Sequence, residues 1–111
     1  MLPYAACLIA DDRVVIERVD NQLMASAPAA IAGKLEVRGI GIIELAPSPP
    51  APVRLIVELV GPGGAARFPD PWPMKIILGL QVPVLQIAAF EAAAPQKVII
   101  ALETATLPAV C

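Results

Sequence analysis

Histidine is absent from this chain of 111 residues, and aromatic residues are scarce at 4%. The missing imidazole excludes Ser-His-Asp and Cys-His catalysis and the common histidine-based metal sites. Acid–base chemistry therefore falls to carboxylates, with Tyr4, the cysteines and the lysines as poorer candidates. Cys7 and Cys111 lie near opposite ends without CxxC spacing, which implies neither a zinc site nor a disulfide framework.

Concentrated positive charge is also lacking, because the eight basic residues are scattered from Arg13 to Lys97. Nucleic-acid binding requires a basic face, so we expect no nucleic-acid partner. The longest apolar stretch, 76–90, is interrupted by polar residues and falls short of the ~20 residues that span a bilayer. The apolar start of the chain has no basic leading segment and is followed by Asp11-Asp12, unlike a signal peptide. These absences predict a cytoplasmic protein without a membrane partner.

Hydrophobic residues are abundant, at 58% of the chain, against 16% charged residues and a net charge of −2. A chain of this size buries roughly two-thirds of its unfolded surface, so a single domain over 1–111 is expected. The few charges leave much of the surface apolar, which indicates a subunit interface. A general bias toward alanine explains the same composition equally well.

The first half of the chain is predicted to be mainly β-structure. The apolar run 5–10 ends at two aspartates, as in a buried strand whose carboxyl end presents acidic side chains. Segments 13–19 and 22–26 are expected to form a hairpin, and 28–32 one helical turn. The segment 35–45 is predicted to form one strand.

Within 35–45, apolar residues lie on one face of the predicted strand, and Glu36 and Arg38 on the other. Gly39 and Gly41 would weaken an ordinary strand, so they mark a bulge or a close backbone approach.

The second half of the chain is predicted to add strands and a helix. The proline-rich segment 46–52 is expected to be a loop that cannot join a sheet ladder. After it we expect a strand over 53–60, a turn-rich segment over 61–73, a hairpin of 74–80 and 82–87, and a helix over 95–106. The expected fold is therefore α/β and β-rich, a mixed sheet of short strands with a C-terminal helix.

These elements, in this order, resemble the C-terminal catalytic domain of HPr kinase/phosphorylase, in the short form typical of alphaproteobacteria. The resemblance runs from about Cys7 to about Leu102. Its most specific parts are Leu-Ile-Ala-Asp-Asp-Arg-Val at 8–14 and the segment 35–43, which looks like the family signature. Weaker support comes from 26–28, 57–60 and 90–98.

The resemblance implies ATP-dependent phosphorylation of a serine on HPr, the small carrier protein of the sugar phosphotransferase system, and the reverse dephosphorylation. It also implies ATP and Mg²⁺ as cofactors, HPr as partner, a homo-oligomer that is a hexamer in the family, and a role in regulating carbohydrate uptake. Such a reaction needs a group that takes the serine proton and a cation that neutralises the phosphates.

The resemblance assigns roles to five residues. The family's catalytic aspartate falls on the Asp11-Asp12 pair, with Asp11 favoured as base and Asp12 as its close support. Glu36 is the candidate metal-facing carboxylate, and Arg38 and Gly39 are candidate cofactor-binding residues, since a guanidinium binds phosphate in a bidentate manner. Without the family pattern, the aspartates read as a turn or helix cap, and Glu36 with Arg38 as an ion pair on an edge strand.

The family's phosphate-binding loop, Gly-x-x-x-x-Gly-Lys-Ser/Thr, has no counterpart in the sequence. Gly33-Lys34 is the sole Gly-Lys pair, and Leu35 stands where the hydroxyl residue should follow. We interpret residues 1–7 as the family's usual beginning, joined to the Asp11-Asp12 strand by a deletion near residue 7, natural or man-made. The segment 81–84 also lacks the arginine of the family's Pro-Gly-Arg loop.

Three interpretations of function therefore stand. The chain is an HPr kinase/phosphorylase whose activity is expected to be impaired, or a non-catalytic regulatory or oligomerisation domain that keeps a protein-binding surface. A generic β-rich oligomerisation module is the third. Whether it is an enzyme is left open, because the Walker A motif is missing and ATP binding is doubtful.

Overall fold

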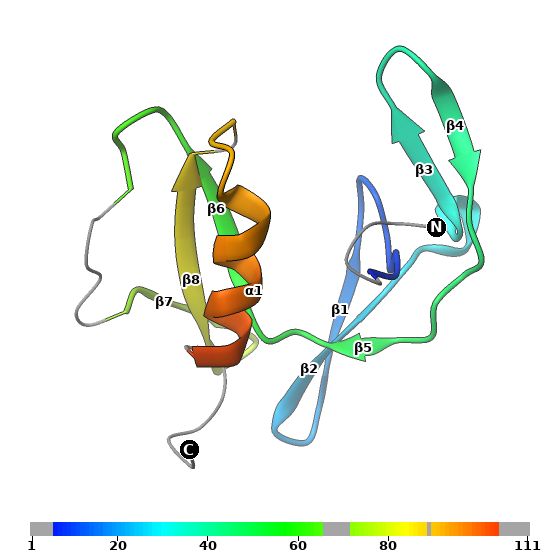
Figure 1. Ribbon diagram of the computed structural model, residues 1–111. Helices are drawn as coiled ribbons and strands as arrows, with labels where there is room; N and C mark the ends of the chain where they lie inside the picture. Colours follow the sequence, from blue (N-terminus) through cyan, green and yellow to red (C-terminus); the bar gives the residue numbers. More distant parts are fainter. Residues whose placement is uncertain (1–5, 66–71, 89, 105–111) are drawn as a thin grey trace. The chain divides into compact units, whose positions relative to one another are not determined.

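The computed structural model describes residues 6–65, 72–88 and 90–104, which divide into two compact units, Met1–Val53 and Arg54–Cys111 (Figure 1). The first unit contains β1 (Val15–Val19), β2 (Gln22–Ser26), the short 3-10 helix η2 (Ala29–Ile31), β3 (Lys34–Val37), β4 (Gly41–Glu44) and β5 (Ala51–Pro52). The second contains β6 (Ile56–Val60), β7 (Met74–Ile77), β8 (Leu80–Ala88) and α1 (Ala94–Thr104).

The hairpin predicted over 13–19 and 22–26 is confirmed as β1 and β2, which pair antiparallel with Val19 opposite Gln22. Its loop is Asp20-Asn21, and Asp20 has a φ of 56°. Aspartate and asparagine tolerate this left-handed conformation better than most residues, which explains the turn. The predicted helical turn over 28–32 is also present, as η2.

The proline-rich segment joins a sheet at its last two residues, so the prediction that 46–52 stays out of any ladder is wrong there. Ala51 and Pro52 pair with Ala25 and Met24 of β2 as the short edge strand β5. Proline is tolerated on an edge strand because its missing N–H can face away from the neighbouring strand. The N–H of Val53 then donates to the Leu23 carbonyl at 2.8 Å.

The buried strand predicted over 5–10 is wrong for the described residues 6–10, which belong to no strand; Ala5 lies outside the described residues. Leu8, Ile9 and Ala10 are only half-buried. A strand requires a neighbour to satisfy its backbone groups, and none of the described strands pairs with this segment. An apolar run by itself does not supply that neighbour.

The single strand predicted over 35–45 is also wrong, because this segment forms the β3–β4 hairpin. The N–H of Ile40 donates to the Val37 carbonyl at 3.0 Å. Gly39, the third residue of this turn, has a φ of +83°, the arrangement of a type II turn, which favours glycine at that position. Gly39, which the sequence predicts to mark a bulge within one strand, therefore lies in the turn that joins two strands.

The second unit is a mixed sheet in the order β6-β8-β7, with β6 parallel and β7 antiparallel to the central β8. The predicted β7–β8 hairpin is confirmed, with Leu78-Gly79 as its loop. The predicted helix is confirmed as α1; residues 105 and 106 lie outside the described residues. Val82, Val84 and Ile87 of β8 and Ala101 of α1 are buried. The predicted fold class, a β-rich mixed sheet with a C-terminal helix, is confirmed.

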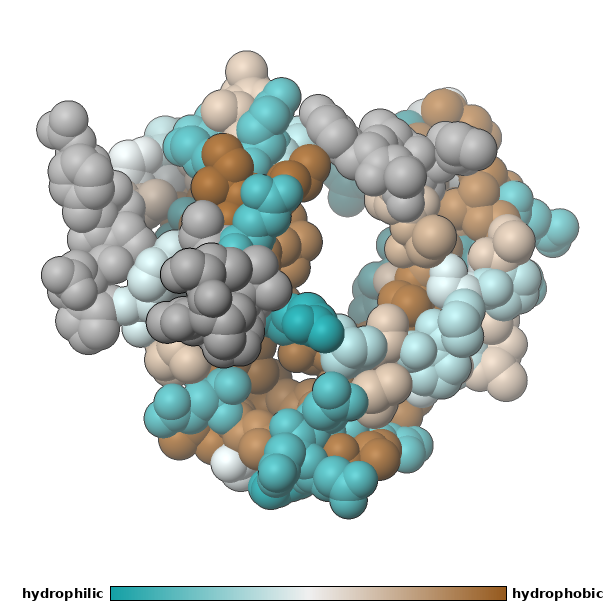
Figure 2. Space-filling view, turned by 60° about the horizontal axis from the view of Figure 1, so that its bottom comes forward, coloured by the Kyte–Doolittle hydropathy of each residue, from teal (hydrophilic) through white to brown (hydrophobic). Residues whose placement is uncertain are grey.

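Large apolar side chains are exposed in both units, as the composition predicts, and Figure 2 shows them interspersed with polar residues on one face of the molecule. None of the described helices is long and apolar enough to cross a membrane.

Candidate functional site

The two most specific segments of the sequence meet in the first unit. The backbone N–H of Glu36, in β3, donates a hydrogen bond of 2.9 Å to Oδ2 of Asp11. The two residues are 25 positions apart in the chain, and Asp11 lies in a bend before β1. This contact therefore fixes the Asp11-Asp12 bend against the edge of the β3–β4 hairpin.

A small hollow of about 160 Å³ opens beside this contact. Its chemistry comes from three carboxylates and one ammonium group, together with two isoleucine side chains. The residues that line it are Asp11, Asp12, Ile31, Lys34, Glu36 and Ile42.

The hairpin presents its part of the hollow through strand alternation. Lys34 and Glu36 are two residues apart in β3, so their side chains share one face, and Ile42 is the β4 residue paired with Glu36. The position of Lys34 depends on Gly33, whose φ is +74°. A Cβ atom on Gly33 would lie 2.6 Å from the carbonyl oxygen of Leu45, so only glycine fits there without a shift.

The structure brings together Asp11, Asp12 and Glu36 but does not place the other two predicted residues with them. Arg38 and Gly39 lie in the turn between β3 and β4, are exposed, and are not among the residues that line the hollow. The alternative ion pair between Glu36 and Arg38 is also not found among the contacts of the described residues. Glu36 and Arg38 would share a face only if one strand continued through both residues. Arg38 lies instead in the turn before Gly39, so its side chain does not align with that of Glu36.

The three carboxylates do not form a metal-binding set in this structure. Within residues 6–65, 72–88 and 90–104, no three Asp, Glu, His or Cys residues are gathered closely enough to hold a metal ion. Asp11 is engaged instead with the backbone of β3. Mg²⁺ is usually held by one or two carboxylates together with water and substrate phosphates, so the role of Glu36 as a metal-facing carboxylate stays a prediction. The sequence offers no phosphate loop for ATP.

Lys34 is the residue of the hollow that sequence reasoning missed as a functional candidate. In the sequence, Lys34 is distinguished only as half of a Gly-Lys pair. Its spacing of two residues from Glu36 was the available signal, because residues i and i+2 of a strand share a face.

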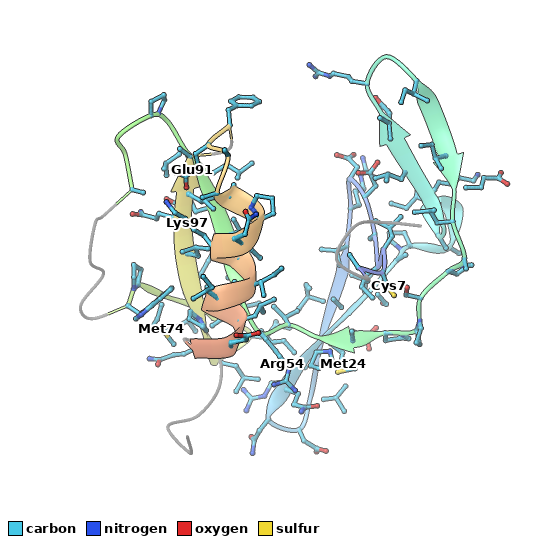
Figure 3. The ribbon with its side chains drawn as sticks, in the orientation of Figure 1. Cys7, Met24, Arg54, Met74, Glu91 and Lys97 are labelled. Carbon is cyan, nitrogen blue, oxygen red and sulfur yellow. The ribbon has the colours of Figure 1, made fainter. Side chains whose placement is uncertain are left out.

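A second hollow, of about 380 Å³, lies in the second unit at the carboxyl ends of the parallel strands β6 and β8. Its lining is mostly apolar and includes Val60, Pro62 and Glu91. Figure 3 shows Glu91 close to Lys97 of α1, and Lys97 Nζ lies 2.8 Å from Glu91 Oε1. None of the predicted site residues lines this hollow.

The chain is similar to curated relatives and to solved structures of one kind of protein. The HPr kinase/phosphorylase of Clostridium tetani is 47% identical over 38 residues, which are 34% of this chain and 12% of the relative. The HPr kinase/phosphorylase of Mycoplasma mycoides is 27% identical over 99 residues, covering 78% of this chain and 32% of the relative. The Hpr(Ser) kinase/phosphatase structure from Coxiella burnetii has a TM-score of 0.67 and 27% identity, over 86% of this chain and 65% of that one. No protein-family model matches the chain.

The chain therefore spans a third or less of the length of the curated relatives it matches. Over that part, both the sequence and the fold confirm the predicted resemblance to HPr kinase/phosphorylases.

Proposed function

We propose, from this similarity in sequence and fold, that residues 1–111 are part of a catalytic domain for phosphorylation and dephosphorylation of a serine on an HPr-type carrier protein. The observation that supports the proposal is the hydrogen bond between Glu36 and Asp11, because it joins the two segments that carry the family resemblance. In this proposal the protein is cytoplasmic and homo-oligomeric, and ATP and Mg²⁺ are the cofactors that the family resemblance implies.

The chemistry assigned to this chain is a proton transfer. In phosphorylation, a carboxylate oxygen of the Asp11-Asp12 pair would take the proton of the carrier's serine hydroxyl as the serine oxygen bonds to phosphorus and the bond from phosphorus to its leaving group breaks. In dephosphorylation, the same carboxylate would take a proton from the attacking water or phosphate and give it to the serine oxygen as the bond between that oxygen and phosphorus breaks. A carboxylate has about four acceptor sites, so Asp11 keeps capacity for this after it accepts the Glu36 N–H.

Glu36 acts in this proposal by placing negative charge in the same hollow as Lys34, on the same face of β3. Lys34 is suited to hold a phosphate oxygen of the phosphoserine product. Arg38 and Gly39, at the exposed tip of the hairpin, are proposed to contact the phosphoryl donor only when partner groups complete the site.

Phosphoryl transfer by the chain alone is expected to be impaired, because such reactions depend mostly on positioning and electrostatic stabilisation of the phosphates. The carboxylates are present, but neither a phosphate loop nor a gathered metal-ligand set accompanies them in the described residues. The same observation supports the second candidate function, a non-catalytic domain that binds the carrier protein.

Two calorimetric titrations of the purified chain distinguish these functions. We expect no micromolar binding of Mg-ATP, and measurable binding of an HPr-type carrier. Micromolar, Mg²⁺-dependent ATP binding would show that the chain holds a complete nucleotide site. If the carrier protein does not bind, both the impaired-enzyme and the carrier-binding interpretations are wrong. The Asp12→Asn variant tests the site, since it should weaken carrier binding while an exposed distant change, Glu17→Gln, should not.

A further inference from the structure

We propose that the outer edge of β3 is a strand-addition site, which takes an extended, basic segment of a partner protein. The site consists of the edge backbone groups of Lys34 and Glu36 and the acidic hollow beside them. It would bind by main-chain pairing whether or not the chain takes part in phosphoryl transfer.

The register of the β3–β4 hairpin shows which backbone groups point to the outer edge. The N–H of Leu45 donates to the Gly33 carbonyl at 2.7 Å, so this pair is hydrogen-bonded. Hydrogen-bonded and non-hydrogen-bonded pairs alternate in an antiparallel ladder. Lys34 opposite Glu44 and Glu36 opposite Ile42 are therefore the non-hydrogen-bonded pairs. The N–H and C=O groups of Lys34 and Glu36 point away from β4.

No other strand of the described residues covers this edge, since β3 and β4 form a sheet of two strands. One backbone donor of this edge is nevertheless hydrogen-bonded, because the Glu36 N–H donates to Oδ2 of Asp11. A carboxylate oxygen occupies the place where the carbonyl of a neighbouring strand would lie. Asp11 therefore acts as a removable cap on an edge that is otherwise ready for pairing.

The charges beside the edge select the partner. Asp11, Asp12 and Glu36 contribute three carboxylates to the hollow, and Lys34 contributes one ammonium group. The excess of negative charge favours a lysine or arginine on the incoming segment, placed beside Glu36 rather than beside Lys34. Binding through an edge strand combines main-chain hydrogen bonds with side-chain pockets of this kind. The occupant is thus an extended segment with a basic residue directed into the hollow.

The test uses the full chain labelled with ¹⁵N and the peptide acetyl-Thr-Val-Lys-Val-Lys-Val-Thr-amide as probe. We expect saturable shifts centred on the Lys34 and Glu36 amides, and at least tenfold slower hydrogen exchange at the Glu36 amide. A control peptide of identical sequence, N-methylated at its valines and its lysines, keeps the charge but has no backbone N–H at these residues with which to pair. It should bind at least tenfold more weakly.

Two variants test whether the charge of the hollow contributes to binding. Asp12→Asn should weaken the probe's affinity severalfold, whereas the exposed Glu17→Gln on β1 should leave it unchanged. Equal binding of both peptides would show simple charge attraction and overturn the proposal, and so would the absence of binding by either peptide. Sedimentation that shows self-association, with protection of the Glu36 amide that rises with chain concentration in the absence of peptide, would mean that a second copy occupies the edge and would also overturn it.

Discussion

The two units of this chain differ in how they are held together. Of the five buried apolar residues among those described, Val82, Val84, Ile87 and Ala101 belong to the second unit, and only Leu23 belongs to the first. The second unit has a central strand, β8, with a neighbour on each side and α1 packed on it. The first has two separate small sheets, and its hairpin is attached to the bend by the contact between Asp11 and Glu36.

The unit with the smaller apolar core is the one that contains the candidate site residues. The candidate site residues are all in the first unit and all exposed, so they can meet a partner or a solvent proton. Isolated two-stranded hairpins are marginally stable, so single contacts and turn glycines should contribute a large share of the stability of the first unit. The second unit supplies apolar burial and none of the predicted acid–base groups. The following variants test this contrast.

The largest effect is expected from Ile87→Ala in the core of the second unit. Ile87 is 2% exposed, so losing its side chain should lower the free energy of unfolding by about 2–5 kcal/mol. Denaturant unfolding followed by hydrogen exchange should show the loss in β6, β8 and α1 amides. The matched control is Ile76→Ala, whose side chain is 67% exposed and whose loss should cost less than about 0.5 kcal/mol. Equal effects from both would contradict the assigned core.

In the first unit the largest effect is expected from Gly33→Ala. The new Cβ would lie 2.6 Å from the Leu45 carbonyl oxygen, and the residue would keep a φ of +74°. We expect destabilisation of the β3–β4 hairpin by about 1–3 kcal/mol. Gly39→Ala is the control, since it also has a positive φ but meets nothing within 4 Å. Hairpin amide exchange compares them, and a milder effect at Gly33 than at Gly39 would refute the close approach.

A smaller effect is expected from Asp11→Ala, which removes the acceptor of the Glu36 N–H. Because the bond is exposed, its loss should cost at most ~1 kcal/mol. We expect severalfold faster hydrogen exchange at the Glu36 amide, with little change in the second unit. Asp12→Ala provides the comparison, because no hydrogen bond from β3 to Asp12 is found among the described residues. Identical exchange in the two variants would show that Asp11 does not hold the hairpin.

The smallest effect is expected from Lys97→Ala in the second unit. Its ion pair with Glu91 is partly exposed, with side chains 51% and 33% accessible, and such pairs contribute about 0.2–1 kcal/mol. Thermal unfolding at low and high salt should show a difference from the parent chain that shrinks as salt rises. A loss comparable to that of Ile87→Ala would mean that charge rather than apolar burial holds this unit.

Much of the second unit was predictable because its elements are short, regular and separated by turn residues. The β7–β8 hairpin and α1 follow from local patterns that involve neighbours in sequence. In the first unit the β1–β2 hairpin follows likewise from its Asp20-Asn21 turn. The predictions failed where secondary structure depended on whether another strand lay alongside. None of the described strands pairs with residues 6–10, whereas Pro52 pairs with Met24 on the edge of β2.

The site shows the same division. The sequence by itself determined which residues are candidates for chemistry: it has no histidine, two adjacent aspartates, and a Glu-x-Arg-Gly segment that resembles one family. Only the tertiary structure decided that Asp11 and Glu36 meet, that Lys34 joins them, and that Arg38 does not. The reason is physical. A residue's type and its local turn are properties of adjacent positions, whereas a hydrogen bond across 25 residues depends on how the chain folds back.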